Sequence, residues 1–114
     1  MTGYRCEHAV VLPEEGDHRI VLALHQAADP WAALRWVLDR ASGVSVHLSA
    51  PAAQAIESLL ADEGERIAFL AALQAGYGYG FEISDPGTGR QQNRTTVHRF
   101  TARRPGSRAV HNTT

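Results

Sequence analysis

The chain has 114 residues, 44% of them hydrophobic, so it is long enough for one domain with a modest core and too apolar to be disordered. Its longest apolar run, residues 67–73, is too short to span a membrane, and residues 1–12 do not resemble a signal peptide. The single cysteine, Cys6, excludes an internal disulfide and favours a cytoplasmic protein.

Charge is divided unevenly along the chain. Residues 1–85 contain 12 acids and 5 arginines, a net charge of −7, whereas residues 86–114 contain 6 arginines and no acid, a net charge of +6. We therefore expect one acidic domain over residues 1–102, followed by a basic, flexible C-terminal tail over residues 103–114.

The first two predicted elements form a β-hairpin. Residues 4–12 place Tyr4, Cys6 and His8 on one face of a strand, and residues 13–17 have the composition of a turn. A second strand is expected at residues 19–25. Its centre is apolar on both faces, as in a central, covered strand.

A helix is predicted to begin at Asp29-Pro30, where Asp caps the free N–H groups and Pro occupies the first turn. We expect it to end at Ser42-Gly43. Its predicted buried side consists of Trp31, Leu34, Val37, Leu38 and Ala41. Trp36 falls on the opposite side and is expected to be exposed.

A short strand is predicted at residues 44–49, and a long helical pattern follows over residues 51–75. One continuous helix of that length would exceed the diameter expected for a compact domain of this size. The hydrophobic phase is continuous through the stretch, but Gly64 lies in its middle. We favour a kink or a tight helix–helix turn near residues 62–65 over a continuous helix.

Two further strands are predicted at residues 77–83 and 95–102, and we expect them to pair. The expected element order is β-β-α-β-α(α)-β-β. The sequence thus predicts an α+β fold in which helices pack on one face of a mainly antiparallel sheet.

Tyr77, Tyr79 and Phe81 alternate with glycines and therefore share one face of their strand. Sheets that recognise RNA use similar spacing to stack bases on aromatic rings. The alternative is that these rings pack against the long helix while the glycines allow close contact. We favour packing, because aromatic residues commonly fill the space between a sheet and its helices.

Residues that could carry out catalysis do not assemble into a recognisable set. Cys6 and His8 share a strand face, but a catalytic pair also needs an orienting group and an oxyanion site. The six histidines lack the spacing of metal ligands. We therefore expect no enzyme activity, no metal and no cofactor.

The sequence favours a small, non-enzymatic binding protein that acts through protein–protein contact, as an inhibitor, an adaptor or a subunit of an assembly. Its partner would be another protein or a second copy of the chain, not a membrane. Tryptophan and arginine dominate interface hot spots, and the predicted contact residues are Trp36, Arg40, Arg99, Arg103 and Arg104. The alternative is nucleic-acid binding through the basic arm, the arginine-rich residues 86–114, with Tyr77, Tyr79 and Phe81 as a stacking platform.

Overall fold

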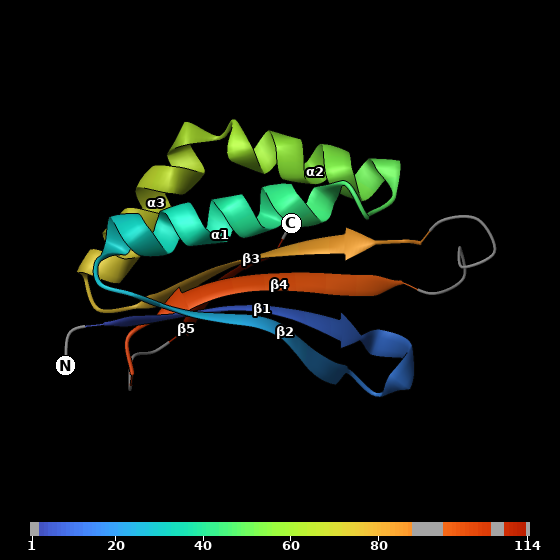
Figure 1. Ribbon diagram of the computed structural model, residues 1–114, viewed down its shortest axis with the longest axis horizontal. Helices are drawn as coiled ribbons and strands as arrows, with labels where there is room; N and C mark the ends of the chain where they lie inside the picture. The colour runs from blue at the N-terminus through green and yellow to red at the C-terminus, as the bar shows by residue number, and fades with distance from the viewer. Residues whose placement is uncertain (1–2, 88–94, 106–108, 114) are drawn as a thin grey trace.

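The computed structural model describes residues 3–87, 95–105 and 109–113. Within them, five strands form one sheet in the order β2-β1-β4-β3-β5, and three helices pack on one of its faces (Figure 1). The elements are β1 (Tyr4–Leu12), the 3₁₀ turn η1 (Pro13–Glu15), β2 (His18–Ala27), α1 (Pro30–Ser45), α2 (Ala50–Leu60), α3 (Glu63–Gln74), β3 (Gly78–Asp85), β4 (Thr96–Arg103) and β5 (Ala109–Thr113).

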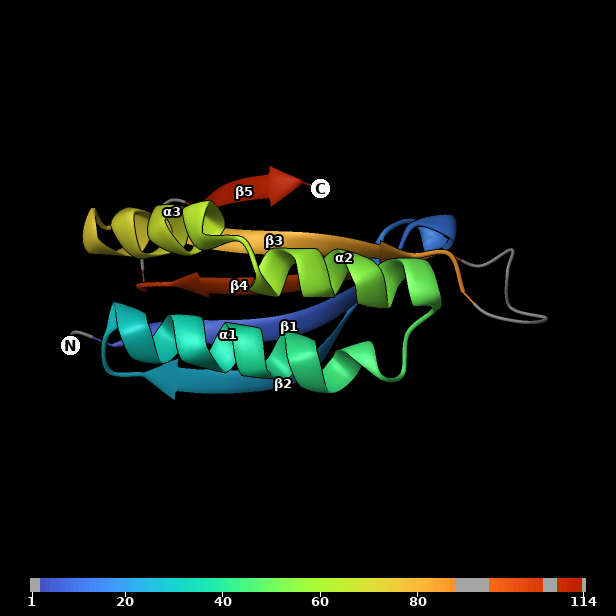
Figure 2. The ribbon, with the colours of Figure 1, turned by 90° about the horizontal axis from the view of Figure 1, so that it is seen from above.

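The arrangement confirms the predicted α+β fold and both predicted hairpins. β1 pairs with β2, and β3 pairs with β4, each in antiparallel register. The hairpins are joined by antiparallel pairing of β1 with β4, at the centre of the sheet. Seen from above, α1 lies over the β1–β2 side, and α2 and α3 lie over the β3 side (Figure 2).

The first helix runs further than the sequence predicts. Its start is as expected, since the Asp29 carboxylate accepts a hydrogen bond from Ala32 N at 2.8 Å. Gly43 lacks the left-handed backbone that would end the helix, which continues to Ser45. The strand predicted at residues 44–49 was therefore wrong. The central strands β1 and β4 are each paired with a strand on both edges, so they offer no place for a further strand. Residues 46–49 instead connect α1 with α2.

The break predicted in the long helical stretch is confirmed. α2 ends at Leu60, and α3 begins at Glu63. Between them Asp62 has an extended backbone, and its side chain accepts a hydrogen bond from Glu65 N at 3.0 Å, capping α3. The break divides the stretch into two helices that each follow the sheet.

The prediction that the second strand is central and covered was wrong. β2 lies at the edge of the sheet and pairs with β1 in the described part of the chain. Its large apolar side chains are 41–55% exposed: Ile20, Val21, Leu22 and Leu24. A run that is apolar on both faces fits a buried strand, but sheet order decides burial, and sequence order does not reveal it.

The predicted C-terminal tail, residues 103–114, contains a strand. β5 pairs with β3 in parallel register, from Gly78 opposite Ala109 to Glu82 opposite Thr113. Residues 106–108 and 114 lie outside the described residues. The predicted flexibility of this tail concerns its motion and stays a prediction.

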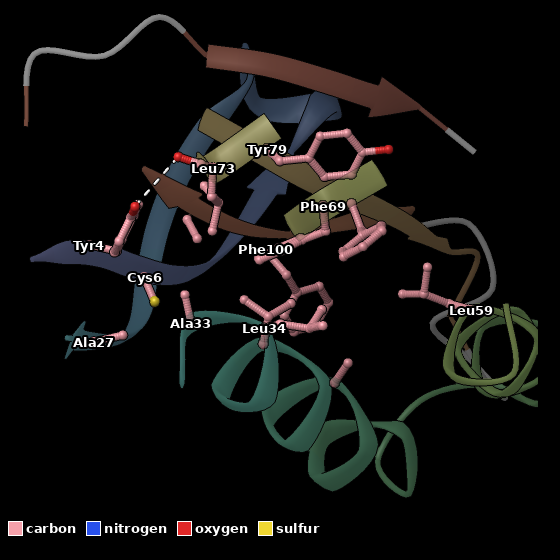
Figure 3. Packing of buried hydrophobic residues seen from close by; sticks show 14 of the residues in the cluster. Tyr4, Cys6, Ala27, Ala33, Leu34, Leu59, Phe69, Leu73, Tyr79 and Phe100 are labelled. Carbon is pink, nitrogen blue, oxygen red and sulfur yellow. Dashed lines mark hydrogen bonds between the residues drawn. The ribbon is translucent and has the colours of Figure 1, made fainter. Parts of the chain in front are cut away.

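The core lies between the helices and the central strands (Figure 3). Phe69 of α3 packs on Phe81 of β3 with ring centres 5.7 Å apart, and Phe100 of β4 is fully buried. At one end of the core the Tyr4 hydroxyl donates a hydrogen bond to the Leu73 carbonyl at 3.4 Å, which links β1 to α3.

Gly80 and Gly43 provide a matched pair of stability predictions. A Cβ at Gly80 would lie 2.8 Å from Thr101 Cγ2 and 3.0 Å from the Phe100 carbonyl oxygen, so Gly80→Ala should destabilise the fold by about 1–3 kcal/mol. Gly43 is helical, and no atom beyond its chain neighbours and the helix's own backbone lies within 4 Å of such a Cβ, so Gly43→Ala should stabilise the fold by about 0.5–1 kcal/mol. Urea unfolding measures both, and equal effects would contradict the β3–β4 packing.

Candidate functional site

Trp36 and Arg40, two of the predicted contact residues, lie on α1 and are half-buried. The Trp36 indole stacks on the His25 ring of β2, with ring centres 5.6 Å apart and planes 2° apart. It also packs against the hydrophobic core. The expectation of an exposed Trp36 was therefore wrong, because the edge strand β2 extends under that flank of α1.

The other three predicted contact residues do not join that surface. Arg99 lies on the sheet face opposite the helices, where its guanidinium pairs with Glu82 at 2.7 Å. Arg103 is exposed on the same face. Arg104 turns towards the Tyr4 hydroxyl, to which its Nε and Nη2 donate at 3.2 and 3.0 Å. The five residues thus belong to separate surfaces, not to one patch.

A chain of buried polar contacts connects α1 to the centre of the sheet. Arg40 Nε donates to His8 Nδ1 at 3.0 Å, and His8 Nε2 lies 2.9 Å from His98 Nδ1. His8 is 0% and His98 7% exposed. Phe100 stacks on the His8 ring with centres 4.4 Å apart. The contacts therefore join α1, β1 and β4 beneath the helix layer.

The protonation pattern of this chain follows from the arginine. A guanidinium can only donate hydrogen bonds, so His8 Nδ1 must accept and carries no proton. Neutral His8 then carries its proton on Nε2, and this N–H donates a hydrogen bond to His98 Nδ1. A second proton on His8 would remove the acceptor of Arg40. The geometry thus requires a neutral His8.

The pKa values agree with that requirement. Burial, together with the smaller effects of the neighbouring His98 and Arg40 charges, lowers the pKa of His8 to about 4. Burial and Arg40 also lower the pKa of His98, although the Asp85 carboxylate acts in the opposite direction. Both imidazoles are therefore neutral at pH 7.

Asp85 and Ser49 form a second buried contact at the end of β3. Ser49 Oγ donates to Asp85 Oδ1 at 2.5 Å, and Gly87 N donates to the same oxygen at 3.0 Å. Burial raises the pKa of Asp85, but these hydrogen bonds outweigh burial and hold the pKa below its ordinary value. The contact fixes the start of α2 to the sheet.

Burial limits the access of a substrate to these groups. The two imidazoles are closed to solvent beneath α1, so no substrate atom reaches them in this conformation. Cys6 is 0% exposed, and burial raises the pKa of its thiol to about 11, which suppresses the reactive thiolate. Cys6 is therefore poorly suited to act as a nucleophile.

The aromatic strand packs against α3. Tyr79 and Phe81 are 7% and 1% exposed, whereas Tyr77, which precedes β3, is 47% exposed. Phe69 contacts both buried rings, and the Tyr79 hydroxyl donates to Glu65 at 2.9 Å. Tyr79 and Phe81 are thus covered by α3 and cannot stack on bases in this conformation. For these two rings, the prediction that they pack against the helix is confirmed.

An open groove of about 720 Å³ runs over the outer surface of α1. It extends from His25 on β2 to Arg66 on α3, and both tryptophans of the chain line it. Trp31 is 66% exposed, and Arg35 beside it is also exposed. Asp29 and Asp39 add negative charge, so an apolar indole lies among charges of both signs.

Trp31 is the functional candidate that the sequence analysis missed, because we assigned it to the buried side of α1. The buried residues of α1 are Ala33, Leu34, Val37 and Ala41. At about 100° per residue, Trp31 and Trp36 both lie roughly 110° from the centre of that face, on opposite flanks. Helical periodicity alone therefore cannot distinguish the exposed tryptophan from the half-buried one.

Comparison with protein-family models, with curated proteins and with solved structures found no match to this chain. In the described part of the chain, no group of three or more His, Cys, Asp or Glu side chains is close enough to hold a metal ion. None of the described helices is both long and apolar enough to cross a membrane.

The buried histidines predict a pH-dependent stability. Between the unfolded pKa of about 6.5 and the folded pKa of about 4, unfolded His8 binds more protons than folded His8. The free energy of unfolding should therefore fall as the pH drops from 7.5 to 5, as measured by urea unfolding at each pH. His8→Gln should flatten this slope, whereas His47→Gln, at an exposed position, should retain it. A wild-type stability that is constant over this range would contradict the neutral-imidazole arrangement.

The two tryptophans should differ in their effect on stability. Trp31→Ala should change the free energy of unfolding by less than about 0.5 kcal/mol, since the side chain is largely exposed. Trp36→Ala should cost about 1–3 kcal/mol, because it removes core packing and the stack on His25. Thermal and urea unfolding measure both, and the reverse order would contradict the assignment.

Proposed function

We propose that this protein is a small, non-enzymatic, cytoplasmic binding protein that contacts another protein through the surface of α1. It would act as an inhibitor, an adaptor or a subunit of an assembly. The observation that carries the proposal is the groove over α1, in which Trp31 is 66% exposed. Tryptophan is enriched at protein interfaces, and here the exposed indole lies in a groove that a second tryptophan also lines.

The chemistry of the groove is typical of a protein interface. Tryptophan and arginine are the residues most often found as binding hot spots, and Trp31, Trp36, Arg35 and Arg66 all line it. Trp36 is held by its stack on His25, so part of the surface is ordered before binding. A preformed wall with an exposed anchor suits a partner that inserts an apolar side chain beside Trp31.

The nucleic-acid alternative has less support. Of its three stacking rings, Tyr79 and Phe81 are covered by α3, and Tyr77 alone remains exposed. Two arginines of the basic arm are engaged within the domain, Arg99 with Glu82 and Arg104 with Tyr4. Both features reduce the surface available to bases and phosphates.

The test is photo-crosslinking in the cells that normally make this protein. A photoreactive phenylalanine analogue replaces Trp31, and a control protein carries it at Ser58, an exposed position on α2. The proposal predicts a discrete protein adduct from position 31 that is absent from position 58. Its mass distinguishes a second copy of the chain from a different protein.

Purified components then measure the contribution of Trp31. Trp31→Ala should weaken binding of the crosslinked protein at least about 10-fold, as expected for a hot spot, while the circular dichroism spectrum stays unchanged. The proposal fails if position 31 gives no specific adduct, or if the partner binds Trp31→Ala as tightly as the wild type.

A further inference from the structure

The sheet face opposite the helices carries an unusual pair of like charges. Residues of β1 alternate, so Tyr4 and Cys6 point to the helices and Arg5 points to the other face. Arg5 lies directly opposite Arg103 in the β1–β4 register, and both are exposed. No described helix covers this face (Figure 1). Like charges directly opposite each other on adjacent strands destabilise a sheet.

The other arginines identified on this face are neutralised. Arg19 of β2 forms an ion pair with Glu7 of β1, and Arg99 of β4 forms one with Glu82 of β3. Among the described residues, Arg5 and Arg103 have no carboxylate within ion-pair distance. In the part of the chain that the structure describes, these two cross-strand neighbours therefore lack an opposite charge at one end of this face.

We propose that Arg5 and Arg103 together bind a carboxylate on an acidic segment of a protein partner. Guanidinium groups recognise carboxylates through paired, charge-assisted hydrogen bonds, and an anion between them removes their mutual repulsion. Gln26 of β2 lies opposite Arg5 on the other side of β1 from Arg103, and it adds an exposed amide beside the arginine pair. Leu24, two residues before Gln26 on β2, lies on the same face of the sheet and is 55% exposed. The partner segment therefore carries an apolar side chain near its carboxylate.

The charge pattern favours a protein carboxylate over a nucleic-acid backbone. Stable binding of a nucleic acid requires neutralisation of several consecutive phosphates. Among the described residues, Arg5 and Arg103 are the cations of this face that lack an ion-pair partner, and the carboxylates of Glu7 and Glu82 lie on the same face. The whole chain carries a net charge of −1, so no overall positive charge attracts an extended polyanion.

This site is separate from the groove proposed above. The groove lies over α1, on the helix side of the sheet, whereas Arg5 and Arg103 lie on the opposite face. Loss of one site leaves the side chains of the other in place. Variants of the two sites therefore test the two proposals independently.

The test is an NMR titration of the full-length protein that follows the arginine Nε–H signals. The probes are a hexapeptide of alternating leucine and glutamate, the same peptide with glutamine for glutamate, and a single-stranded oligonucleotide of twelve thymidines. The proposal predicts saturable shifts of Arg5 and Arg103 with the glutamate peptide and none with the glutamine peptide. It fails if the glutamate peptide gives no saturable shift, or if the oligonucleotide binds more tightly.

Variants determine which side chains carry the binding. Arg5→Gln and Arg103→Gln should each weaken peptide binding at least about 10-fold, and the loss should shrink as salt screens the interaction. Gln54→Glu, at an exposed position on α2, lowers the net charge of the protein by the same amount and should bind as the wild type does. Equal weakening by Gln54→Glu would show a general charge effect and overturn the proposal.

Thermal unfolding tests the repulsion itself. Without a bound anion, Arg5→Gln should raise the melting temperature by about 1–2 °C at low ionic strength, and the difference should disappear at high salt. A lower melting temperature for this variant at low salt would show that the pair is not repulsive and would overturn the proposal.

Discussion

The antiparallel pairing of β1 with β4 holds the molecule together. These two strands come from opposite ends of the chain, and each belongs to its own hairpin. Their pairing forms one sheet from the two hairpins and gives the three helices a continuous surface to cover. Contacts between residues so far apart in the sequence lower the free energy only after a long loop has closed, which costs conformational entropy. The helices that follow β2 in sequence gain their full packing surface when β4 reaches its place beside β1.

The same pairing creates the buried polar chain under α1. His8 and His98 come from β1 and β4, and their register brings the two imidazoles within 2.9 Å. Burying polar groups costs free energy unless each has a partner, and here Arg40 completes the set. In the described residues, every fully buried side-chain nitrogen or oxygen has a hydrogen-bond partner. The chain of contacts therefore fixes the position of α1 on the sheet more specifically than apolar packing alone would.

A sheet covered on one face gives this protein two different exposed surfaces, and we propose that a partner binds at each of them. On the helix side, the exposed indole of Trp31 lies in a groove with charged residues around it. On the other side, Arg5 and Arg103 form a basic pair that has no ion-pair partner among the described residues. One surface is suited to an apolar side chain and the other to a carboxylate. Two such surfaces are compatible with an adaptor that holds two partners, or with a subunit that contacts two neighbours.

Local sequence patterns determined the type of most elements, because capping, turn chemistry and hydrophobic alternation act within a few residues. They located both hairpins, the start of α1, the break at Asp62 and the fold class. Tertiary structure decided what depends on sheet order: which strand lies at the edge, and whether residues 44–49 pair. It also decided which tryptophan is exposed, since Trp31 and Trp36 flank the buried face of α1 equally, and only β2 lies beneath one of them. The His8–His98 contact and the arginine pair likewise depend on β1–β4 register, which links residues about 90 positions apart and leaves no local signal.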